Sequence, residues 1–194
     1  MPTISASSLM NERLLTYLYT QSNKTDREIA EFFNVDRTFV TKVRAEFGVD
    51  ARITTGYIGE QKAIKKLRSK GFRVKDMNAR DKLSPFDLLV NGRVKIEVKS
   101  AKRVGNRFSF ALSEQASRNC KESDERIVLT TGRTKKLFSK TCDYFIFVCI
   151  GDVEDVYYII PSHALEDDIP TLNIRVGTLK FERFKNNWEL LRKG

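Results

Sequence analysis

Histidine, tryptophan and long apolar runs are scarce in this sequence. Its 194 residues include one histidine, His163, and one tryptophan. A single imidazole cannot build a metal centre of several histidines, and it gives little support to a Ser-His-Asp hydrolase. The longest apolar run, Tyr144–Ile150, is far shorter than the roughly 20 residues of a membrane span. The N-terminus has neither a basic start nor a long apolar stretch. We therefore expect a cytoplasmic protein with no membrane partner.

Cysteine is also too rare to organise the fold. The three cysteines, Cys120, Cys142 and Cys149, form no CxxC pair and leave one thiol over. Neither a disulfide framework nor a zinc site of paired cysteines is supported by this spacing. We expect these side chains to be buried, reduced thiols.

Positive charge, by contrast, is abundant and concentrated in one segment. The chain has 35 Lys and Arg against 25 Asp and Glu, a net charge of +10, and a hydrophobic content of 41% that excludes a disordered basic tail. Residues 56–110 contain 15 basic and 5 acidic residues, while the segments on either side are each balanced. Such a field attracts polyanions, of which nucleic acid is the commonest. A ribosome, an acidic protein partner or a solvated lysine-rich helix would also fit charge alone.

The first 50 residues predict three short helices. The first spans residues 11–19, where leucines recur at helical spacing. The second begins at Thr25, which forms a capping box with Glu28, and ends before Asn34, a residue that tolerates a left-handed turn. Asp36 then caps a third helix that extends to Phe47.

The order of small, turn and apolar residues in this segment resembles the helix-turn-helix family. The matching positions are Ala30, Asn34, Val35, Val40 and Val43, although the family usually has glycine where Asn34 stands. The resemblance implies a DNA-binding domain over residues 1–50 that contacts double-stranded DNA through its third helix. The residues implied are Arg37, Thr38, Thr41, Lys42 and Arg44. Because the segment has no net charge, a module for dimerisation or for docking on the second domain is the alternative.

A lysine-rich helix is predicted over residues 58–70, after a linker over residues 49–56. Its apolar face carries Ala63, Ile64 and Leu67, and Glu60 falls on the same face. An acid in the first turn also stabilises a helix through the macrodipole, by about 0.3–1 kcal/mol. Glu60 is therefore either a site residue or a helix-end charge.

A β-hairpin is predicted over residues 86–99. Pairing Phe86 with Val98, Leu88 with Ile96 and Val90 with Val94 makes one face apolar and sets Asp87 opposite Glu97. The Asn91-Gly92 pair instead favours a two-residue loop, which would shift the register by one residue. Such a slip would move a whole apolar set into water, so we expect a three-residue loop or a bulge.

The polar face of this hairpin collects charges that are costly as pure structure. Glu97 and Lys99 alternate along one strand, with Asp87 opposite. Neighbouring carboxylates raise one another's pKa unless a cation compensates, and a divalent ion with oxygen ligands is a natural compensator. The alternative is a solvated face with a Glu-Lys cross-strand pair.

The helix and hairpin together resemble the PD-(D/E)XK nuclease superfamily, whose members include restriction enzymes, junction resolvases and some homing endonucleases. The matching elements are Glu60 on a helix, Pro85-Phe86-Asp87 and Glu97-Val98-Lys99, with Phe86 as an extra residue between the Pro and the Asp. Strands at 143–148 and 156–161 resemble the closing strands of that fold.

This resemblance implies an α/β domain over residues 56–194, with a restriction-endonuclease-like mixed central sheet flanked by helices. It also implies that Asp87, Glu97 and the Val98 carbonyl bind Mg2+ and that Lys99 assists the attacking water. Glu60 would bind a second ion or a metal-bound water. Lys102 and Arg103 would contact DNA, and Gln115, on a possible helix after the catalytic strand, is a weaker site candidate.

The sequence thus predicts a Mg2+-dependent DNA endonuclease, an enzyme that hydrolyses phosphodiester bonds. Site-specific cleavage of the restriction or homing type is favoured, because a separate DNA-reading module implies sequence choice. The alternatives are a structure-selective nuclease of the Holliday-junction type and a non-catalytic DNA-binding regulator on a nuclease scaffold. Cutting both strands needs two sites, so a homodimer is a possible state.

Overall fold

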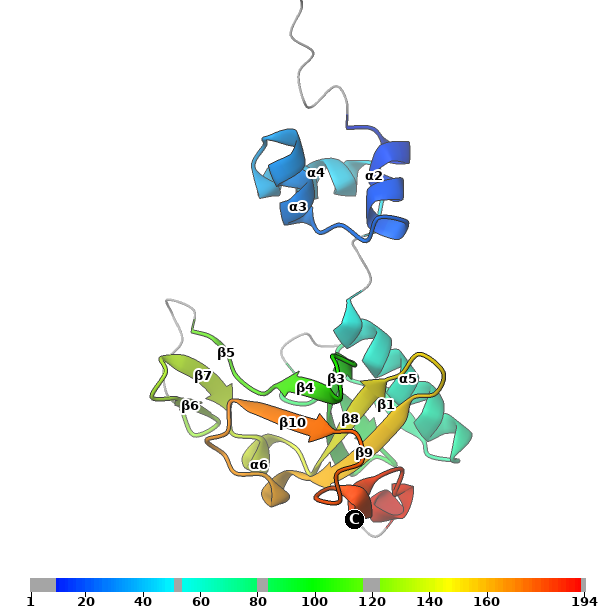
Figure 1. Ribbon diagram of the computed structural model, residues 1–194, viewed down its shortest axis with the longest axis vertical. Coiled ribbons are helices and arrows are strands. Elements are labelled where there is room, and N and C mark those ends of the chain that lie inside the picture. Colours follow the sequence, from blue (N-terminus) through cyan, green and yellow to red (C-terminus); the bar gives the residue numbers. More distant parts are fainter. Residues whose placement is uncertain (1–9, 51–53, 80–83, 117–122, 193–194) are drawn as a thin grey trace, which may run out of the picture. The chain divides into compact units, whose positions relative to one another are not determined.

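The computed structural model describes residues 10–50, 54–79, 84–116 and 123–192 (Figure 1). The chain divides into two compact units, Met1–Thr54 and Thr55–Gly194. Residues 51–53 of the expected linker lie outside the described residues, as does Cys120.

Three helices form the first unit: α2 (Glu12–Thr20), α3 (Asp26–Phe33) and α4 (Arg37–Glu46). The Thr25 hydroxyl accepts from the Glu28 amide and the Glu28 carboxylate accepts from the Thr25 amide, which is the expected capping box. Asn34 takes the left-handed conformation, with φ 52° and ψ 49°, and turns the chain between α3 and α4. Leu15 and Val40 lie in the core where the helices meet. The predicted helices and turn are confirmed.

A five-stranded mixed sheet organises the second unit. Its strand order is β1-β2-β3-β8-β9, in which only β3 and β8 are parallel neighbours. The strands are β1 (Val74–Asp76), β2 (Leu88–Val90), β3 (Val94–Lys102), β8 (Tyr144–Ile150) and β9 (Val156–Pro161). The expected strands at 143–148 and 156–161 are therefore present. The parallel pair places β8 beside the strand that carries Glu97 and Lys99.

One face of this sheet is covered by α5 (Thr55–Ser69) and by the C-terminal turn η3 (Trp188–Arg192). Ala63, Ile64 and Leu67 of α5 are buried there, as the helical pattern predicts. Trp188 packs in the same core, with its ring centroid 5.4 Å from that of Tyr157. The helix starts three residues before its predicted beginning, so residues 55–56 are helical and do not belong to a linker.

The other face is covered mainly by a two-stranded ribbon and not by a long helix. β4 (Arg107–Ala111) pairs with β10 (Thr171–Arg175) (Figure 1). Their inward side chains join the phenylalanine-rich core. The expectation of a sheet flanked by helices is thus wrong for this face, because the period-two pattern of residues 107–111 makes a strand. Gln115 lies exposed in β5 (Glu114–Gln115), and within residues 103–116, the described stretch directly after β3, there is no helix.

The hairpin of β2 and β3 has the predicted register. Leu88 pairs with Ile96 and Val90 with Val94. Residues 91–93 form a three-residue turn, closed by the Arg93 amide, which donates to the Val90 carbonyl at 3.1 Å. The expected pairing of Phe86 with Val98, on the same apolar face as Leu88, is wrong. The Phe86 side chain lies in the core on the opposite face of the sheet from Leu88. The Leu88–Ile96 pair is the last of the ladder, and Phe86 lies beyond it.

The connection from β4 to β8 contains a small three-stranded sheet and a short helix. The sheet order is β5-β7-β6, with β6 at Arg126–Val128 and β7 at Arg133–Lys136, and α6 follows at Phe138–Thr141. Two of the cysteines, Cys142 and Cys149, are buried and free, and burial raises the pKa of each thiol to about 12. None of the described helices combines the length and apolar character that crossing a membrane requires.

Candidate active site

Glu97 is a buried carboxylate held by two lysines. It lies on β3 with its side chain 4% exposed, on the strand face opposite to Val98. Lys99 Nζ donates to Glu97 Oε1 at 2.7 Å, and Lys136 Nζ donates to Glu97 Oε2 at 3.0 Å. Lys136 comes from β7 and also donates to the Pro85 carbonyl at 2.8 Å. The two ammonium groups neutralise a charge that burial alone would make very unfavourable.

Asp87 stands where the β2–β3 ladder ends. Its amide donates to the Ile96 carbonyl at 3.0 Å, and its Oδ2 accepts from the Val98 amide at 2.7 Å. Its Oδ1 accepts from Asn78 Nδ2 at 3.0 Å. The carboxylate thus takes a strand amide as its partner, which fixes it beside Glu97.

Glu60 approaches the same place from α5. Its Oε2 lies 3.5 Å from Asn78 Nδ2, so one amide group reaches both Glu60 and Asp87. Gly59, the preceding residue, lies against β3: a Cβ atom there would come within 2.2 Å of Ser100 Cβ. This close approach brings the first half of α5 onto the strand that carries Glu97.

The electrostatics of the three acids show an excess of negative charge. Burial raises the pKa of Asp87 above its ordinary value, and the Glu97 carboxylate raises it further. Burial also raises the pKa of Glu60, with a further increase from Asp87. Burial by itself would lower the pKa of Lys99, but the Glu97, Asp87 and Glu114 carboxylates outweigh it and raise that pKa. Lys99 is therefore an ammonium at neutral pH.

A cavity of about 210 Å³ opens beside these groups. It is lined by Glu97, Lys99 and Lys136, and on its other side by residues 111–114 and Phe138. Lys136 also lines a neighbouring pocket of about 380 Å³ with Ser84, Pro85, Glu125 and Arg126. Lys136 thus lines two pockets, and Glu97 lines the smaller of them.

The site offers carboxylate oxygens, the donor type that hard divalent cations prefer. Among the described residues no group of three or more His, Cys, Asp or Glu side chains is drawn together closely enough to form a metal centre. Carboxylate oxygens are nevertheless the ligands that Mg2+ prefers, and the raised pKa values of Asp87 and Glu60 mark a site short of positive charge. Lysine ammonium groups occupy both oxygens of Glu97, so an incoming ion competes with them.

The structure brings together the sequence-predicted residues Glu60, Asp87, Glu97 and Lys99, with the Val98 backbone against Asp87. Lys102 and Arg103 lie exposed at and just beyond the end of β3. Glu114 lines the cavity, whereas its neighbour Gln115 does not.

The predicted DNA-contacting residues of α4 fall into two groups. Arg37, Thr38 and Lys42 are exposed. Thr41 Oγ1 instead donates to Asp26 Oδ2 at 2.7 Å, and Arg44 Nε lies 3.6 Å from Asp26 Oδ1. Because these last two side chains hold α4 against α3, we limit the proposed contacts of this helix to the first group.

Three site residues were not found by sequence reasoning: Asn78, Glu114 and Lys136. Lys136 lies 39 residues from Glu97 in the chain, and only the fold of the β4–β8 connection brings them together. Asn78 reaches Asp87 because β1 runs antiparallel to β2. No local pattern in the sequence marks Lys136, because all four residues of Arg133–Lys136 are polar and show no period-two alternation.

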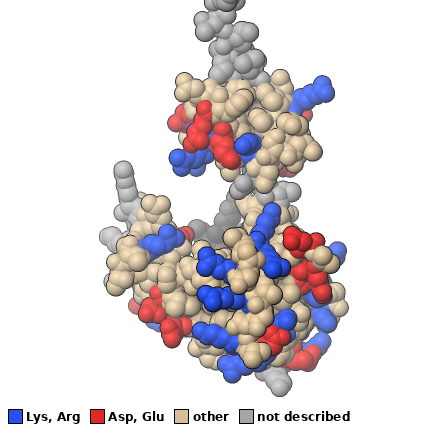
Figure 2. Space-filling model, viewed as in Figure 1, with Lys and Arg blue, Asp and Glu red and all other residues tan. Residues whose placement is uncertain are grey.

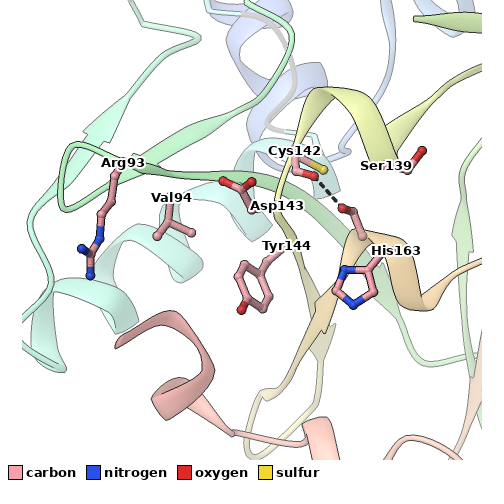
Figure 3. A pocket seen from close by; sticks show the side chains of 8 residues that line it. Arg93, Val94, Ser139, Cys142, Asp143, Tyr144 and His163 are labelled. Atoms are coloured by element: carbon pink, nitrogen blue, oxygen red, sulfur yellow. Dashed lines mark hydrogen bonds between the residues drawn. The ribbon is translucent and has the colours of Figure 1, made fainter. Parts of the chain in front are cut away.

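A larger pocket, of about 450 Å³, lies at the start of β3 and β8 (Figure 3). It is lined by His163 and Asp143 among others, but Asp143 Oδ2 already accepts from the Lys95 amide at 2.7 Å. The hydroxyl of Ser162 donates to the Cys142 carbonyl at 2.6 Å (Figure 3). These polar groups join β8 to its neighbours and are separate from the carboxylate site.

Comparisons with known proteins agree with a nuclease-like fold. No protein-family model matches the sequence, and no curated protein matches it. Among solved structures, the fold is similar to that of a bacterial homing endonuclease, I-Ssp6803I, with a TM-score of 0.53 and 13% sequence identity. The match covers 72% of this chain and 91% of that one. At this identity the likeness concerns the fold alone.

Proposed function

We propose that this protein is a Mg2+-dependent DNA endonuclease of the PD-(D/E)XK type, cutting at specific sites. The observation that carries the proposal is the buried Glu97 carboxylate, which faces a cavity together with Lys99 and lies beside Asp87. The acids of this site, Glu60, Asp87 and Glu97, belong to the strongly basic segment 56–110. The structural likeness to a homing endonuclease supports the same reading.

Asp87 and Glu97 would hold the Mg2+ ion, with the Val98 carbonyl and Glu60 as further oxygen donors. When bound, Mg2+ supplies Lewis-acid activation and stabilises charge on a phosphoryl group. The protein's own part is to keep these carboxylates fixed: Asn78 and the Val98 amide orient Asp87, and β3 orients Glu97.

Lys99 acts through its charge. Its ammonium lines the cavity and is kept protonated by the surrounding carboxylates, so it is poorly suited to accept a proton. In the proposed reaction it hydrogen-bonds the attacking water and offsets negative charge that develops on the scissile phosphate. Removing one such preorganised donor commonly lowers turnover by a factor of about 10²–10³.

The first unit would select the DNA site. Its turn at Asn34 suits a helix-turn-helix module, in which the helix after the turn, here α4, enters the major groove. That helix exposes Arg37, Thr38 and Lys42. Such a reader adds sequence choice to a nuclease domain. Site-specific cleavage is accordingly preferred to cleavage by DNA structure.

The test is cleavage of supercoiled plasmids and of a synthetic four-way junction in Mg2+. Wild type is compared with Asp87→Asn, with Lys99→Met, and with Glu154→Gln and Lys140→Met as charge-matched controls at exposed positions. We expect discrete fragments from wild type and both controls, and a loss of at least about 100-fold in Asp87→Asn and Lys99→Met.

Each alternative has its own result. Nicking of the junction with intact plasmids would point to a structure-selective nuclease. If wild type binds the plasmid yet leaves every substrate intact across Mg2+ and Mn2+, the protein is a DNA-binding regulator and not an enzyme. Equal cleavage by wild type and by both site variants would show that the activity comes from elsewhere.

A further inference from the structure

The β4–β10 ribbon has one buried and one exposed face. Its inward side chains, Phe108, Phe110, Leu172 and Ile174, are all at most 8% exposed. The outward face carries three cross-strand pairs in register: Arg107 with Arg175, Ser109 with Asn173, and Ala111 with Thr171. The Ser109 hydroxyl donates to Asn173 Oδ1. This outward face is called the ribbon face below.

Arg107 and Arg175 are directly opposed like charges. Such a pair destabilises an antiparallel ribbon unless a counter-charge is present. Among the described residues neither side chain has an ion pair or a hydrogen bond, and both are exposed. No Asp or Glu occurs in residues 98–113 or 169–181, which include both strands and their adjoining turns. No carboxylate among the described residues forms an ion pair with either guanidinium group, so both remain available to an anion from outside.

The ribbon face leads into the cavity of the carboxylate site. Arg107, Ser109 and Ala111 follow one another along the outward side of β4, and Ala111 lines the cavity with Glu97 and Lys99. At about 3.4 Å per residue, Arg107 lies roughly 14 Å along the strand from Ala111. Figure 2 shows Lys and Arg side chains gathered on the side of the second unit that carries β10 in Figure 1.

The turn at the far end of the ribbon extends the positive charge. Val104 pairs with Arg107 across this turn, so Lys102 and Arg103 lie next to the arginine pair. Val176, which follows Arg175, donates its amide to the Asn106 carbonyl at 2.8 Å and closes the same end. Four basic residues therefore lie at one end of the ribbon, and Arg107 is about 14 Å along the strand from Ala111 at the cavity.

We infer that the ribbon face is a duplex-DNA-binding surface of the second unit, distinct from the first unit's α4. Arg107 and Arg175 bind backbone phosphates, and Asn173 is placed toward the base edges. A two-stranded ribbon has the width of the B-DNA major groove, and phosphates supply the missing counter-charge. The inference rests on the proposed endonuclease function, because it assigns the surface that holds DNA beside the cavity.

The test measures binding apart from cleavage. The full chain is titrated with a 30-bp mixed-sequence duplex in EDTA over a range of salt concentrations, using fluorescence anisotropy. The double variant Arg107→Gln/Arg175→Gln is compared with wild type and with Arg68→Gln/Lys70→Gln. The last pair removes two exposed charges at the end of α5, which covers the opposite face of the sheet.

We expect the ribbon variant to bind at least tenfold more weakly at low salt. The slope of the logarithm of its DNA association constant against the logarithm of salt concentration should be less steep than that of wild type by about 1.8. The α5 variant should keep the wild-type slope. Because the arginines repel each other, the melting temperature of the ribbon variant should equal or exceed that of wild type. A lower melting temperature would indicate a structural role and overturn the inference.

Equal binding by wild type and the ribbon variant would also overturn it, whether or not the protein cuts DNA. If wild type binds DNA with the expected dependence on Arg107 and Arg175 but cuts nothing in Mg2+, the endonuclease proposal fails and the ribbon surface stands. Absence of any duplex binding by wild type would overturn both.

Discussion

At the scale of single residues, the candidate site is a set of acids with too few cations. Glu97 is held by Lys99 and Lys136, while Asp87 and Glu60 rely on neutral donors, chiefly Asn78. Burial raises the pKa of both Asp87 and Glu60, with further increases from neighbouring carboxylates. In the metal-free site these carboxylates therefore repel one another, and a bound cation would reduce that repulsion.

Lys136 should oppose metal binding. Its ammonium shares Glu97 with Lys99, and an ion that binds Glu97 must replace it or accept a second positive charge nearby. We expect Lys136→Met to bind Mg2+ about tenfold more tightly than wild type, equivalent to about 1.4 kcal/mol. Isothermal titration calorimetry without DNA measures this. Lys140→Met, which removes an exposed charge on α6, should leave the affinity unchanged. Unchanged or weaker Mg2+ binding by Lys136→Met would contradict the competition.

Glu60 should destabilise the metal-free protein. Its carboxylate is half-buried and close to Asp87, so replacing it with glutamine removes a desolvated and repelled charge. We expect Glu60→Gln to raise the free energy of unfolding at pH 7 by about 1 kcal/mol, an increase of roughly 4 °C in melting temperature. Differential scanning fluorimetry in EDTA measures it. Mg2+ should reduce this difference in melting temperature, because it stabilises wild type more than the variant. A melting temperature of Glu60→Gln below that of wild type in EDTA would contradict the prediction.

At the scale of elements, the contact between α5 and β3 positions the site. Gly59 meets Ser100 with no room for a side chain, and the Ser100 hydroxyl donates to the Thr55 carbonyl at 2.8 Å. Ser100 of β3 thus contacts α5 at two positions, Thr55 and Gly59, which lie about one helical turn apart. Glu60 reaches Asn78 and the Asp87 site only because this helix lies so close.

A methyl group at position 59 should push the helix away. In Gly59→Ala the new Cβ would come within 2.2 Å of Ser100 Cβ, an overlap that the strand cannot relieve by a side-chain rotation. We expect a loss of about 1–3 kcal/mol in unfolding free energy, measured by urea denaturation. In Gly59→Ala/Ser100→Gly the closest remaining atom is the Ser100 Cα at 3.6 Å, so the double variant should lose less than the sum of the two single changes. Additive losses would show that the two residues do not collide.

At the scale of the whole molecule, the two units differ in net charge and in the internal interactions that stabilise each of them. The second unit has two large apolar cores, on either side of its main sheet. The first has one small core, supplemented by Asp26, which accepts from Tyr19 at 2.7 Å and from Thr41 at 2.7 Å. The first unit therefore depends more on one ionised side chain.

Acid should unfold the first unit selectively. Burial would raise the pKa of Asp26, but hydrogen bonds from Tyr19 and Thr41 and the charge of Arg44 outweigh it and lower that pKa. A lowered pKa means that Asp26 contributes stability above its unfolded value of about 3.9, and that this contribution is lost as the pH falls through the lower folded value. We expect protection of α2–α4 amides to fall from pH 5 toward pH 2, measured by hydrogen exchange with mass spectrometry. Peptides of β3 and β8 serve as the internal control.

The variant Asp26→Asn supplies the matching comparison. It should lower the stability of the first unit at pH 7 by about 1–3 kcal/mol, because a charged hydrogen-bond acceptor becomes neutral. Its α2–α4 protection should then change less with acid than that of wild type, while the second unit exchanges as before. Equal acid sensitivity in wild type and Asp26→Asn would show that another group controls this unit.

The sequence by itself determined the local features. Thr25 and Glu28 form their capping box because both partners lie within one helical turn, and Asn34 turns the chain because its own backbone tolerates a positive φ. The register of Leu88 against Ile96 followed from period-two alternation across a short turn. Helix and hairpin spacing limits where side chains point, and this allowed four site residues to be predicted: Glu60, Asp87, Glu97 and Lys99.

Only the tertiary structure decided which distant groups complete the site. Lys136 and Asn78 reach the carboxylates through a long connection and through the pairing of β1 with β2, which no local pattern specifies. The same holds for Phe86, because the ladder ends at Leu88 and leaves Phe86 free to pack on the other face. Arg107 and Arg175 are ordinary surface residues in the sequence. They become an opposed pair only when β4 and β10, 64 residues apart at Ser109 and Asn173, align in one ribbon.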